Sequence, residues 1–361
     1  MSKTSLGIVI LIGWLGRIGG TPPTAFAFPD DGKSLVYVQP PAVSTPSGPC
    51  DRRCLDGFVD KYFEALGSHC PCRVAMDPEV KYTENGQLLR PGEGIWKTFA
   101  RRGTYRIYLA DPSTGMAGYY GDFSEDQGLL QGVMALRLRV KDHRIVEVEM
   151  IVAREQLRPS GGLGANTAGV MTPRMIDELQ PKGFLSPDSA LLEPVPAAKR
   201  STTEQLIEVT DRYFEAFTQS KNQTAPFDGE CFRRENGVRA TDNSSGPVVD
   251  PEQPAFRVFS QSCAGEIDRG FFSALAKVRD KRHLVVDEEQ GLVLDLTLFD
   301  NPGNVRLVSV PGIGAVTVPA EFLRPITYLE PQLFKVEDGK IRGIEGLAWP
   351  VPYGMRCGWA P

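Results

Sequence analysis

The 361-residue chain has no block of basic residues and only a short N-terminal apolar run. Its 40 basic and 45 acidic residues give a formal net charge of −5, so it lacks the positive footprint of a nucleic-acid-binding protein. The apolar run, residues 6–15, is shorter than the roughly 20 residues that a membrane-spanning helix needs. We therefore expect neither a nucleic-acid partner nor a stable membrane span.

Common catalytic signatures are also missing. The sequence contains no Gly-rich phosphate loop, no Gly-x-Ser-x-Gly elbow and no His-Glu-x-x-His helix. Hydrolase and nucleotide chemistry therefore lack support, and we expect no cofactor. Cys70-Pro-Cys72 beside His69 is similar to the start of a metal site. No second Cys/His cluster with zinc-like spacing completes four ligands, so no metal is predicted.

What the sequence does contain is a repeat. The phrase Asp60-Lys-Tyr-Phe-Glu-Ala-Leu66 returns as Asp211-Arg-Tyr-Phe-Glu-Ala-Phe217. Each copy is followed at the same distance by Glu-Asn-Gly, beginning at Glu84 and at Glu235. Later segments of the two copies also match each other, but the distance between matching segments increases toward the C-terminus. The pattern predicts two copies of one unit, with insertions in the second.

Changes in composition predict the domain boundaries. Residues 1–27 have a positive start, an apolar core and an Ala-x-Ala-like end, which is typical of a secretory signal peptide; an uncleaved anchor is the alternative. An extended leader rich in Pro, Ser and Gly follows over 28–49, and a linker covers 157–200. We expect one domain over 50–156 and a second, with insertions and a C-terminal tail, over 201–361. Such a protein would be secreted or periplasmic.

The seven cysteines would enter an oxidising compartment on export, so some of them should pair. Cys231 and Cys263 bracket the main insertion of the second unit and are the first choice for a disulfide. A separate group surrounds the first predicted helix: Cys50, Cys54, Cys70 and Cys72. The odd count leaves one thiol over.

Apolar spacing predicts a helix at the start of each unit. Leu55, Val59 and Tyr62 fall on one helical face, and a capping-box pattern, Ser201-Thr-Thr-Glu204, precedes a similar stripe in the second unit. Strands are predicted at 104–110, 116–123, 133–140 and 145–153, and then at 283–286, 292–299, 305–310 and 325–336. The fold class is therefore α+β.

Charged residues alternate along two neighbouring predicted strands. Arg137 and Arg139 share one face of their strand, and Glu147 and Glu149 can lie across from them. We interpret these pairs as a solvated charge ladder and not as catalytic groups. The C-terminal tail, which begins at Trp349, has no period, and such a segment usually packs across a neighbouring surface.

The order of these features resembles the nuclear transport factor 2-like, or SnoaL-like, superfamily. A helix with Tyr-x-x-Ala-Leu, an extended segment with an acidic residue before Gly, and long antiparallel strands carry the resemblance over both units. Cys50-Asp-Arg-Arg-Cys-Leu and Tyr82-Thr-Glu-Asn-Gly-Gln87 are similar to an uncharacterised group of secreted bacterial and fungal proteins. The resemblance implies two tandem cone-shaped domains. In each, a curved antiparallel sheet would wrap N-terminal helices and leave a pocket at the open end.

The resemblance also implies a candidate acid–base site. Ketosteroid isomerase, a member of the superfamily, uses a carboxylate base together with a tyrosine. Tyr62 matches its first-helix tyrosine, and Glu84 falls near the position of its base. An enzyme of this kind would be a cofactor-independent lyase or isomerase in which Glu84 removes a proton and Tyr62 or Tyr82 donates a hydrogen bond. The structural alternatives are a core tyrosine and a turn-forming glutamate.

The expected ligand is a small apolar molecule. Further binding candidates are Tyr82, Trp96, Tyr105, Glu235, Tyr213 and His283. Because no specific catalytic motif occurs, a noncatalytic ligand-binding or interaction module is the alternative to an enzyme. Oligomer formation is compatible with either function.

Overall fold

The computed structural model describes residues 48–128, 130–154, 186–220, 225–235, 238–241, 261–318 and 320–359. The predicted signal peptide, almost all of the predicted leader and most of the predicted linker lie outside these residues. Residues 48–154 are termed the first half here, and residues 186–359 the second half.

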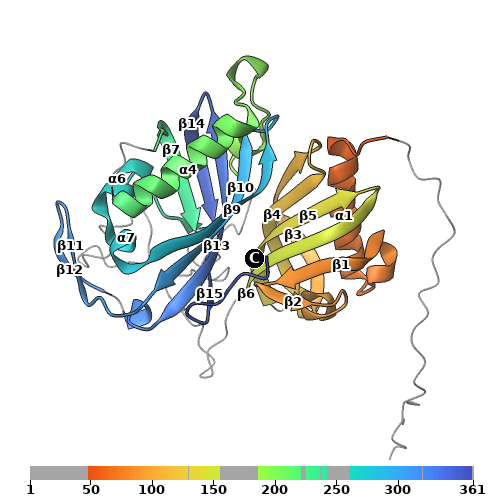
Figure 1. The fold of residues 1–361 in the computed structure, drawn as a ribbon, viewed down its shortest axis with the longest axis horizontal. Coiled ribbons are helices and arrows are strands. Elements are labelled where there is room, and N and C mark those ends of the chain that lie inside the picture. The colour runs from red at the N-terminus through yellow and green to blue at the C-terminus, as the bar shows by residue number, and fades with distance from the viewer. Residues whose placement is uncertain are drawn as a thin grey trace, which may run out of the picture. The chain divides into compact units, whose positions relative to one another are not determined.

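The first half is a helix packed on a curved, six-stranded sheet (Figure 1). Its elements are α1 (Arg52–Gly67), η1 (Pro71–Arg73), β1 (Met76–Glu84), β2 (Gln87–Leu89), η2 (Gly94–Lys97), β3 (Phe99–Asp111), β4 (Met116–Glu125), η3 (Asp126–Gly128), β5 (Leu130–Lys141) and β6 (Arg144–Arg154). The strand order is β2-β1-β6-β5-β4-β3. All neighbours are antiparallel except β1 and β6, which are parallel. The sheet is therefore mixed and not purely antiparallel, because the crossover through β3, β4 and β5 brings β6 back beside β1 in the same direction.

The second half repeats this strand order. Its elements are α3 (Ser189–Leu192), η4 (Ala197–Lys199), α4 (Thr203–Gln219), β7 (Phe227–Glu235), β8 (Val238–Arg239), α6 (Cys263–Arg269), α7 (Phe271–Leu275), β9 (Lys277–Asp287), β10 (Leu292–Asn301), β11 (Leu307–Val310), β12 (Gly314–Thr317), η6 (Ala320–Phe322), β13 (Ile326–Glu337), β14 (Lys340–Gly346) and β15 (Trp349–Val351). The main sheet runs β8-β7-β14-β13-β10-β9, with β7 parallel to β14. β15 pairs with β13, whereas β11 and β12 form a separate hairpin. The predicted strand at 305–310 thus belongs to that hairpin and not to the main sheet.

Both main helices begin at side-chain caps. Asp51 Oδ1 accepts a hydrogen bond from the backbone N–H of Cys54 at the start of α1. At α4, Thr202 and Gln205 form a reciprocal capping box, so the cap lies one residue later than the predicted Ser201. Each helix buries its apolar stripe against its own sheet, and α4 lies across the second one (Figure 1).

Each sheet buries both of its faces. In β5, Met134, Leu136 and Leu138 join the core beneath α1, whereas Val133 and Ala135 join a core shared by the two halves. The second sheet contributes to the shared core from Leu292, Leu294, Leu296 and Leu298 in β10 and from Leu329 and Leu333 in β13. The halves therefore have separate helix-side cores and are joined by a third, sheet-to-sheet core.

Buried ion pairs cross the same junction. Glu149 in β6 accepts hydrogen bonds from Arg282 in β9 and from Arg137 in β5. The register, which the sequence left open, places Arg137 opposite Glu149 and Arg139 opposite Glu147. The interpretation as a solvated ladder is wrong for the first of these pairs. Arg137 and Glu149 are only 4 % and 2 % exposed, because the second half covers this face of the sheet.

The C-terminal tail crosses from the second half onto the first sheet. The Trp359 ring centroid lies 4.1 Å from Lys81 Nζ and 4.4 Å from Arg137 Cζ. Its indole N–H donates to Thr83 Oγ1 at 2.7 Å. Cys357, in the same segment, is buried in the shared core. The tail thus packs across a neighbouring surface, as predicted.

Three disulfides are present in the described residues. The predicted Cys231–Cys263 bond is confirmed and ties β7 to α6. The cysteines near α1 form two further bonds, Cys50–Cys54 and Cys70–Cys72. The remaining thiol is Cys357.

Candidate functional site

Glu84 ends β1 with a buried carboxylate that is fully engaged. Its Oε2 accepts hydrogen bonds from the backbone N–H of Ile95 at 2.7 Å and from the Tyr82 hydroxyl at 3.1 Å. Its Oε1 accepts from Arg154 Nη2 at 2.8 Å. Gly94 makes the approach possible, because a Cβ there would lie 2.2 Å from Glu84 Oε2 and the backbone has φ +63°. The carboxylate therefore ties β1 to η2 and to the end of β6.

Arg154 extends this arrangement into a closed network. Its Nε donates to Glu125 Oε2 at 2.7 Å, and Glu125 accepts from the Thr98 hydroxyl. The Glu84 carboxylate is thus paired with a guanidinium and accepts two further hydrogen bonds, so both of its oxygens are engaged with the protein. These contacts suit a structural role for Glu84 better than the role of a general base.

Tyr62 lies near Glu84 without binding to it. Among the described residues, the donors to Glu84 are Ile95, Tyr82 and Arg154. The Tyr62 hydroxyl and the Trp96 indole N–H are both buried, and neither makes a hydrogen bond of normal geometry to a described residue. Their rings meet edge to face with centroids 5.3 Å apart. Burial raises the pKa of Tyr62, and the neighbouring indole N–H offsets part of that rise.

The corresponding region of the second half contains a cavity. It lies between α4, β7, α6 and α7 and has a volume of about 20 Å³, which is room for about one water molecule. Its lining is Tyr213, Phe217, Arg233, Cys263, Glu266, Ile267, Gly270, Phe272, Ser273 and Ile344. The sequence favoured the first half for the pocket. There Trp96 packs against Tyr62, whereas Tyr213 borders open space.

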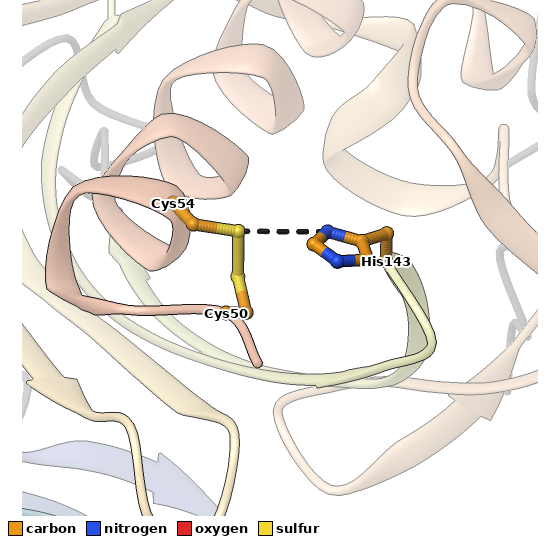
Figure 2. A group of neighbouring side chains, drawn as sticks. All are labelled: Cys50, Cys54 and His143. Atoms are coloured by element: carbon orange, nitrogen blue, oxygen red, sulfur yellow. Dashed lines mark hydrogen bonds between the residues drawn. A yellow bond between two sulfur atoms is a disulfide. The ribbon is translucent and has the colours of Figure 1, made fainter. Parts of the chain in front are cut away.

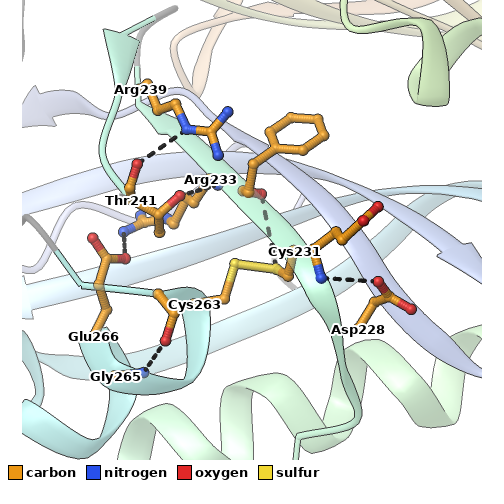
Figure 3. The surroundings of a disulfide bond; sticks show 11 residues. Asp228, Cys231, Arg233, Arg239, Thr241, Cys263, Gly265 and Glu266 are labelled. Carbon is orange, nitrogen blue, oxygen red and sulfur yellow. Dashed lines mark hydrogen bonds and ion pairs between the residues drawn. A yellow bond between two sulfur atoms is a disulfide. The ribbon is translucent and has the colours of Figure 1, made fainter. Parts of the chain in front are cut away.

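Arg233 is the central charge at this cavity. Its Nη2 lies 2.5 Å from Glu235 Oε2, and its Nη1 lies 3.6 Å from Glu266 Oε2. Figure 3 shows Arg233 between β7 and α6, beside the Cys231–Cys263 bond. Its Nε has no hydrogen-bond partner among the described residues. A ligand with a polar acceptor atom would satisfy this donor.

Two neighbouring groups have altered proton affinity. Burial, together with the negative charge of Glu235, raises the pKa of Glu330 to about 8. The Glu330 carboxyl also accepts from Gln332 Nε2 at 2.9 Å. Burial raises the pKa of Tyr213 to about 12, although the charge of Arg233 opposes the rise. The neutral forms of Glu330 and Tyr213 are therefore favoured, and the charged residues that line the cavity are Arg233 and Glu266.

The other candidates lie elsewhere. Tyr105 is at the junction of the halves, where its hydroxyl contacts Glu345 and Arg234. His283 bridges two carboxylates, Asp295 at 2.7 Å and Asp211 at 3.2 Å. Burial disfavours its charged form, but the two carboxylates outweigh burial, so the pKa of His283 is raised. The structure thus groups Tyr62, Tyr82, Glu84 and Trp96 in one region, and Tyr213 and Glu235 in another.

The sequence analysis did not identify Arg154, Arg233 or Glu266 as part of these clusters. Arg233 had a usable signal, because it stands two residues before Glu235 and therefore on the same face of a strand. Arg154 reaches Glu84 through the long-range pairing of β6 with β1, which no local pattern indicates.

A separate group of side chains surrounds the start of α1. Ligand atoms of Cys50, Cys54 and His143 all lie within 4.8 Å of one another (Figure 2). The two sulfur atoms are bonded to each other, so in this state the group is a disulfide beside a histidine and not a metal centre.

Comparisons with known proteins assign no activity. The model of a domain of unknown function, DUF8021, matches residues 199–348. Among solved structures, the chain is similar to an NTF2-like protein from Burkholderia thailandensis. The two share 18 % identity over 27 % of this chain and 89 % of that chain, with a TM-score of 0.22. No curated protein matches. Within the described residues, no helix has the length and apolar character needed to cross a membrane.

Proposed function

We propose that the protein is an exported, noncatalytic module that binds a small, largely apolar molecule with one acceptor group. The site is the cavity of the second half. The observation that carries the proposal is that Arg233 Nε has no hydrogen-bond partner in the part of the chain that the structure describes. The cavity wall around Arg233 includes Glu266 and the apolar side chains of Phe217, Ile267, Phe272 and Ile344. Apolar walls with a few convergent polar groups are typical of small-molecule sites.

The size of the cavity limits the ligand. The enclosed space of about 20 Å³ accepts only a few atoms, so the bulk of a ligand would lie toward the opening. The ligand's acceptor, a carboxylate or carbonyl oxygen, would face Arg233, and its apolar part would contact α6 and α7. The three disulfides favour an oxidising compartment and so support export.

We also propose that the halves are two copies of one nuclear transport factor 2-like unit, with boundaries near 50–156 and 201–361. The repeated phrases and the identical strand order support this proposal. The second copy differs by the insertion that contains α6 and α7, and these helices form much of the cavity wall.

Benzoate is a suitable probe, because it combines an apolar ring with a carboxylate. Titration followed by calorimetry or NMR should show saturable binding with a dissociation constant on the order of millimolar. Ser273→Phe places a ring in the cavity and should abolish binding. The matched control Ala274→Phe puts the same ring at the next, exposed position of α7 and should leave binding unchanged. Equal binding by both variants would contradict the proposed site.

A second candidate function is cofactor-free proton transfer in the first half. The observation that favours it is a pair of buried donors beside Glu84, the Tyr62 hydroxyl and the Trp96 indole N–H, which make no hydrogen bond of normal geometry to any described residue. They could bind the oxygen of a keto compound. Turnover of such a compound, abolished by Glu84→Gln in a protein that still folds, would establish an enzyme in place of a binding module.

A further inference from the structure

The Cys50–Cys54 disulfide closes across the start of α1 and lies against the β5–β6 turn (Figure 2). His143, in that turn, places its Nδ1 3.7 Å from Cys54 Sγ. All three side chains are only partly buried, so a small reagent can reach them. The Cys231–Cys263 disulfide differs in this respect, because its cysteines are 5 % and 3 % exposed.

The second ring nitrogen of His143 determines what the first can do. His143 Nε2 lies 2.9 Å from the carbonyl oxygen of Gly48. A carbonyl oxygen only accepts hydrogen bonds, so Nε2 must carry a hydrogen. A neutral imidazole carries one hydrogen, and Nδ1 therefore presents its lone pair toward Cys54 Sγ. If the disulfide opens, a proton acceptor is already in place for the Cys54 thiol.

The position of Cys54 on its helix also favours the thiolate form of this residue. Cys54 lies in the first turn of α1, where backbone N–H groups and the helix dipole stabilise negative charge. The Asp51 carboxylate at the same end opposes a thiolate but already accepts from the Cys54 amide. The nearby Arg52 is held by Asp287 and Glu289. His143 is therefore the group that is close to the sulfur and has a ring nitrogen free to take up a proton.

His143 also occupies a costly backbone position. Asp142 and His143 both have positive φ, 49° and 54°, in a two-residue hairpin turn whose second position favours glycine. The equivalent turn between β13 and β14 has Asp338 and Gly339, at φ 51° and 68°. The first half therefore carries an imidazole at the turn position where the second half has glycine.

The same comparison applies to the two cysteines. Cys50 stands ten residues before the phrase that begins at Asp60, and Ser201 stands ten residues before the phrase that begins at Asp211. Cys54 corresponds in the same way to Gln205. The two cysteines and the histidine thus occur together in the first half, and all three are replaced in the second.

We infer that Cys50–Cys54 is a thiol–disulfide exchange site whose substrates are low-molecular-weight thiols and their disulfides. A thiolate RS⁻ attacks Cys50 Sγ and forms a mixed disulfide, while the Cys50–Cys54 bond breaks. Cys54 leaves with the electron pair of that bond. The proton that the incoming thiol RSH gave up on ionisation passes to His143 Nδ1, and the resulting imidazolium stabilises the Cys54 thiolate or returns the proton to it. A second thiolate attacks the R sulfur, releases RSSR and leaves Cys50 reduced. Two thiols are thereby oxidised and one disulfide is reduced, and the steps reverse when RSSR is in excess.

The first test is the rate of reduction by glutathione in the full-length protein, with each disulfide followed by alkylation and mass spectrometry. Cys50–Cys54 should open well before Cys231–Cys263. Because His143 stabilises the leaving thiolate, the Cys50–Cys54 bond should open roughly tenfold more slowly in His143→Asn. Asparagine suits this variant because it tolerates positive φ. Cys70–Cys72 should keep its rate and so provides a control within the same molecule.

The second test separates chemistry from structure. After selective opening of Cys50–Cys54 at neutral pH, the wild-type protein should show the ultraviolet absorbance of a thiolate, and His143→Asn should show much less. His143→Gly, which matches Gly339 in the other turn, should behave like His143→Asn. The inference is overturned if the variants reduce within twofold of wild type, if no thiolate absorbance appears, or if Cys231–Cys263 opens first.

Discussion

Arg282→Met should destabilise the protein through Glu149, on the other side of the junction between the halves. The guanidinium of Arg282 contacts both oxygens of Glu149, whose side chain is 2 % exposed. Breaking a buried pair by removing one partner typically costs about 3–5 kcal/mol. Arg137 still contacts Glu149 at 3.2 Å, so the charge is not left wholly unpaired. We therefore expect a loss of about 2–3 kcal/mol in the free energy of unfolding.

Urea unfolding monitored by circular dichroism measures this loss. The matched control is Arg139→Met, which breaks the pair with Glu147 on the same sheet, where the arginine side chain is 46 % exposed. That change should cost less than about 1 kcal/mol. A double-mutant cycle completes the experiment, because Arg282→Met should cost much less when Glu149→Gln is already present. Equal losses for the two arginine variants, or a cycle with no coupling, would refute the reasoning.

Three further predictions concern other parts of the molecule. The pKa of Glu330 is raised from 4.5 to about 8, so between these pH values the folded state binds the proton more tightly than the unfolded state. The free energy of unfolding should therefore fall as pH rises through this window. The fall should be smaller in Glu330→Gln when thermal unfolding of the two proteins is compared at each pH. Trp359→Ala should cost about 1–2 kcal/mol in urea unfolding and Trp359→Phe about half as much, because phenylalanine keeps a ring over the cations but loses the bond to Thr83; equal costs would contradict a role for the ring, and no cost in Trp359→Phe would contradict a role for the bond. Replacing Cys231 and Cys263 by alanine opens a loop with a sequence separation of 32, for which chain entropy predicts a loss of about 3–4 kcal/mol; a loss below about 1 kcal/mol would show that the bond adds little constraint.

Local patterns predicted the elements whose signals lie within one segment or one hairpin. The apolar stripe of α1 and the shared face of Arg137 and Arg139 could both be predicted, because helical and strand periodicities fix which side chains share a face. The register that sets Arg137 opposite Glu149 could not be predicted in this way. The disulfide Cys231–Cys263 could be predicted because the two cysteines bracket an insertion.

Pairings between strands that are distant in the sequence could not be predicted. The parallel contact of β1 with β6 determines that Arg154 meets Glu84, and the two residues are separated by 70 positions. Packing between the sheets had a weaker signal that the sequence analysis did not use. In β10 the alternate residues Leu292, Leu294 and Leu296 are all apolar, and Val293 on the opposite face is apolar too, which favours a strand buried on both sides.

The contact of Trp359 with β1 has a consequence for truncating or tagging the protein. The indole of Trp359 covers part of a strand whose Thr83 lies 276 positions earlier in the sequence. A variant truncated before Trp359 would therefore lose this cover, and Thr83, Lys81 and Arg137 would lose their contacts with the indole. A purification tag placed directly after Trp359 would compete with the same contact, and a tag separated by a flexible spacer would preserve it.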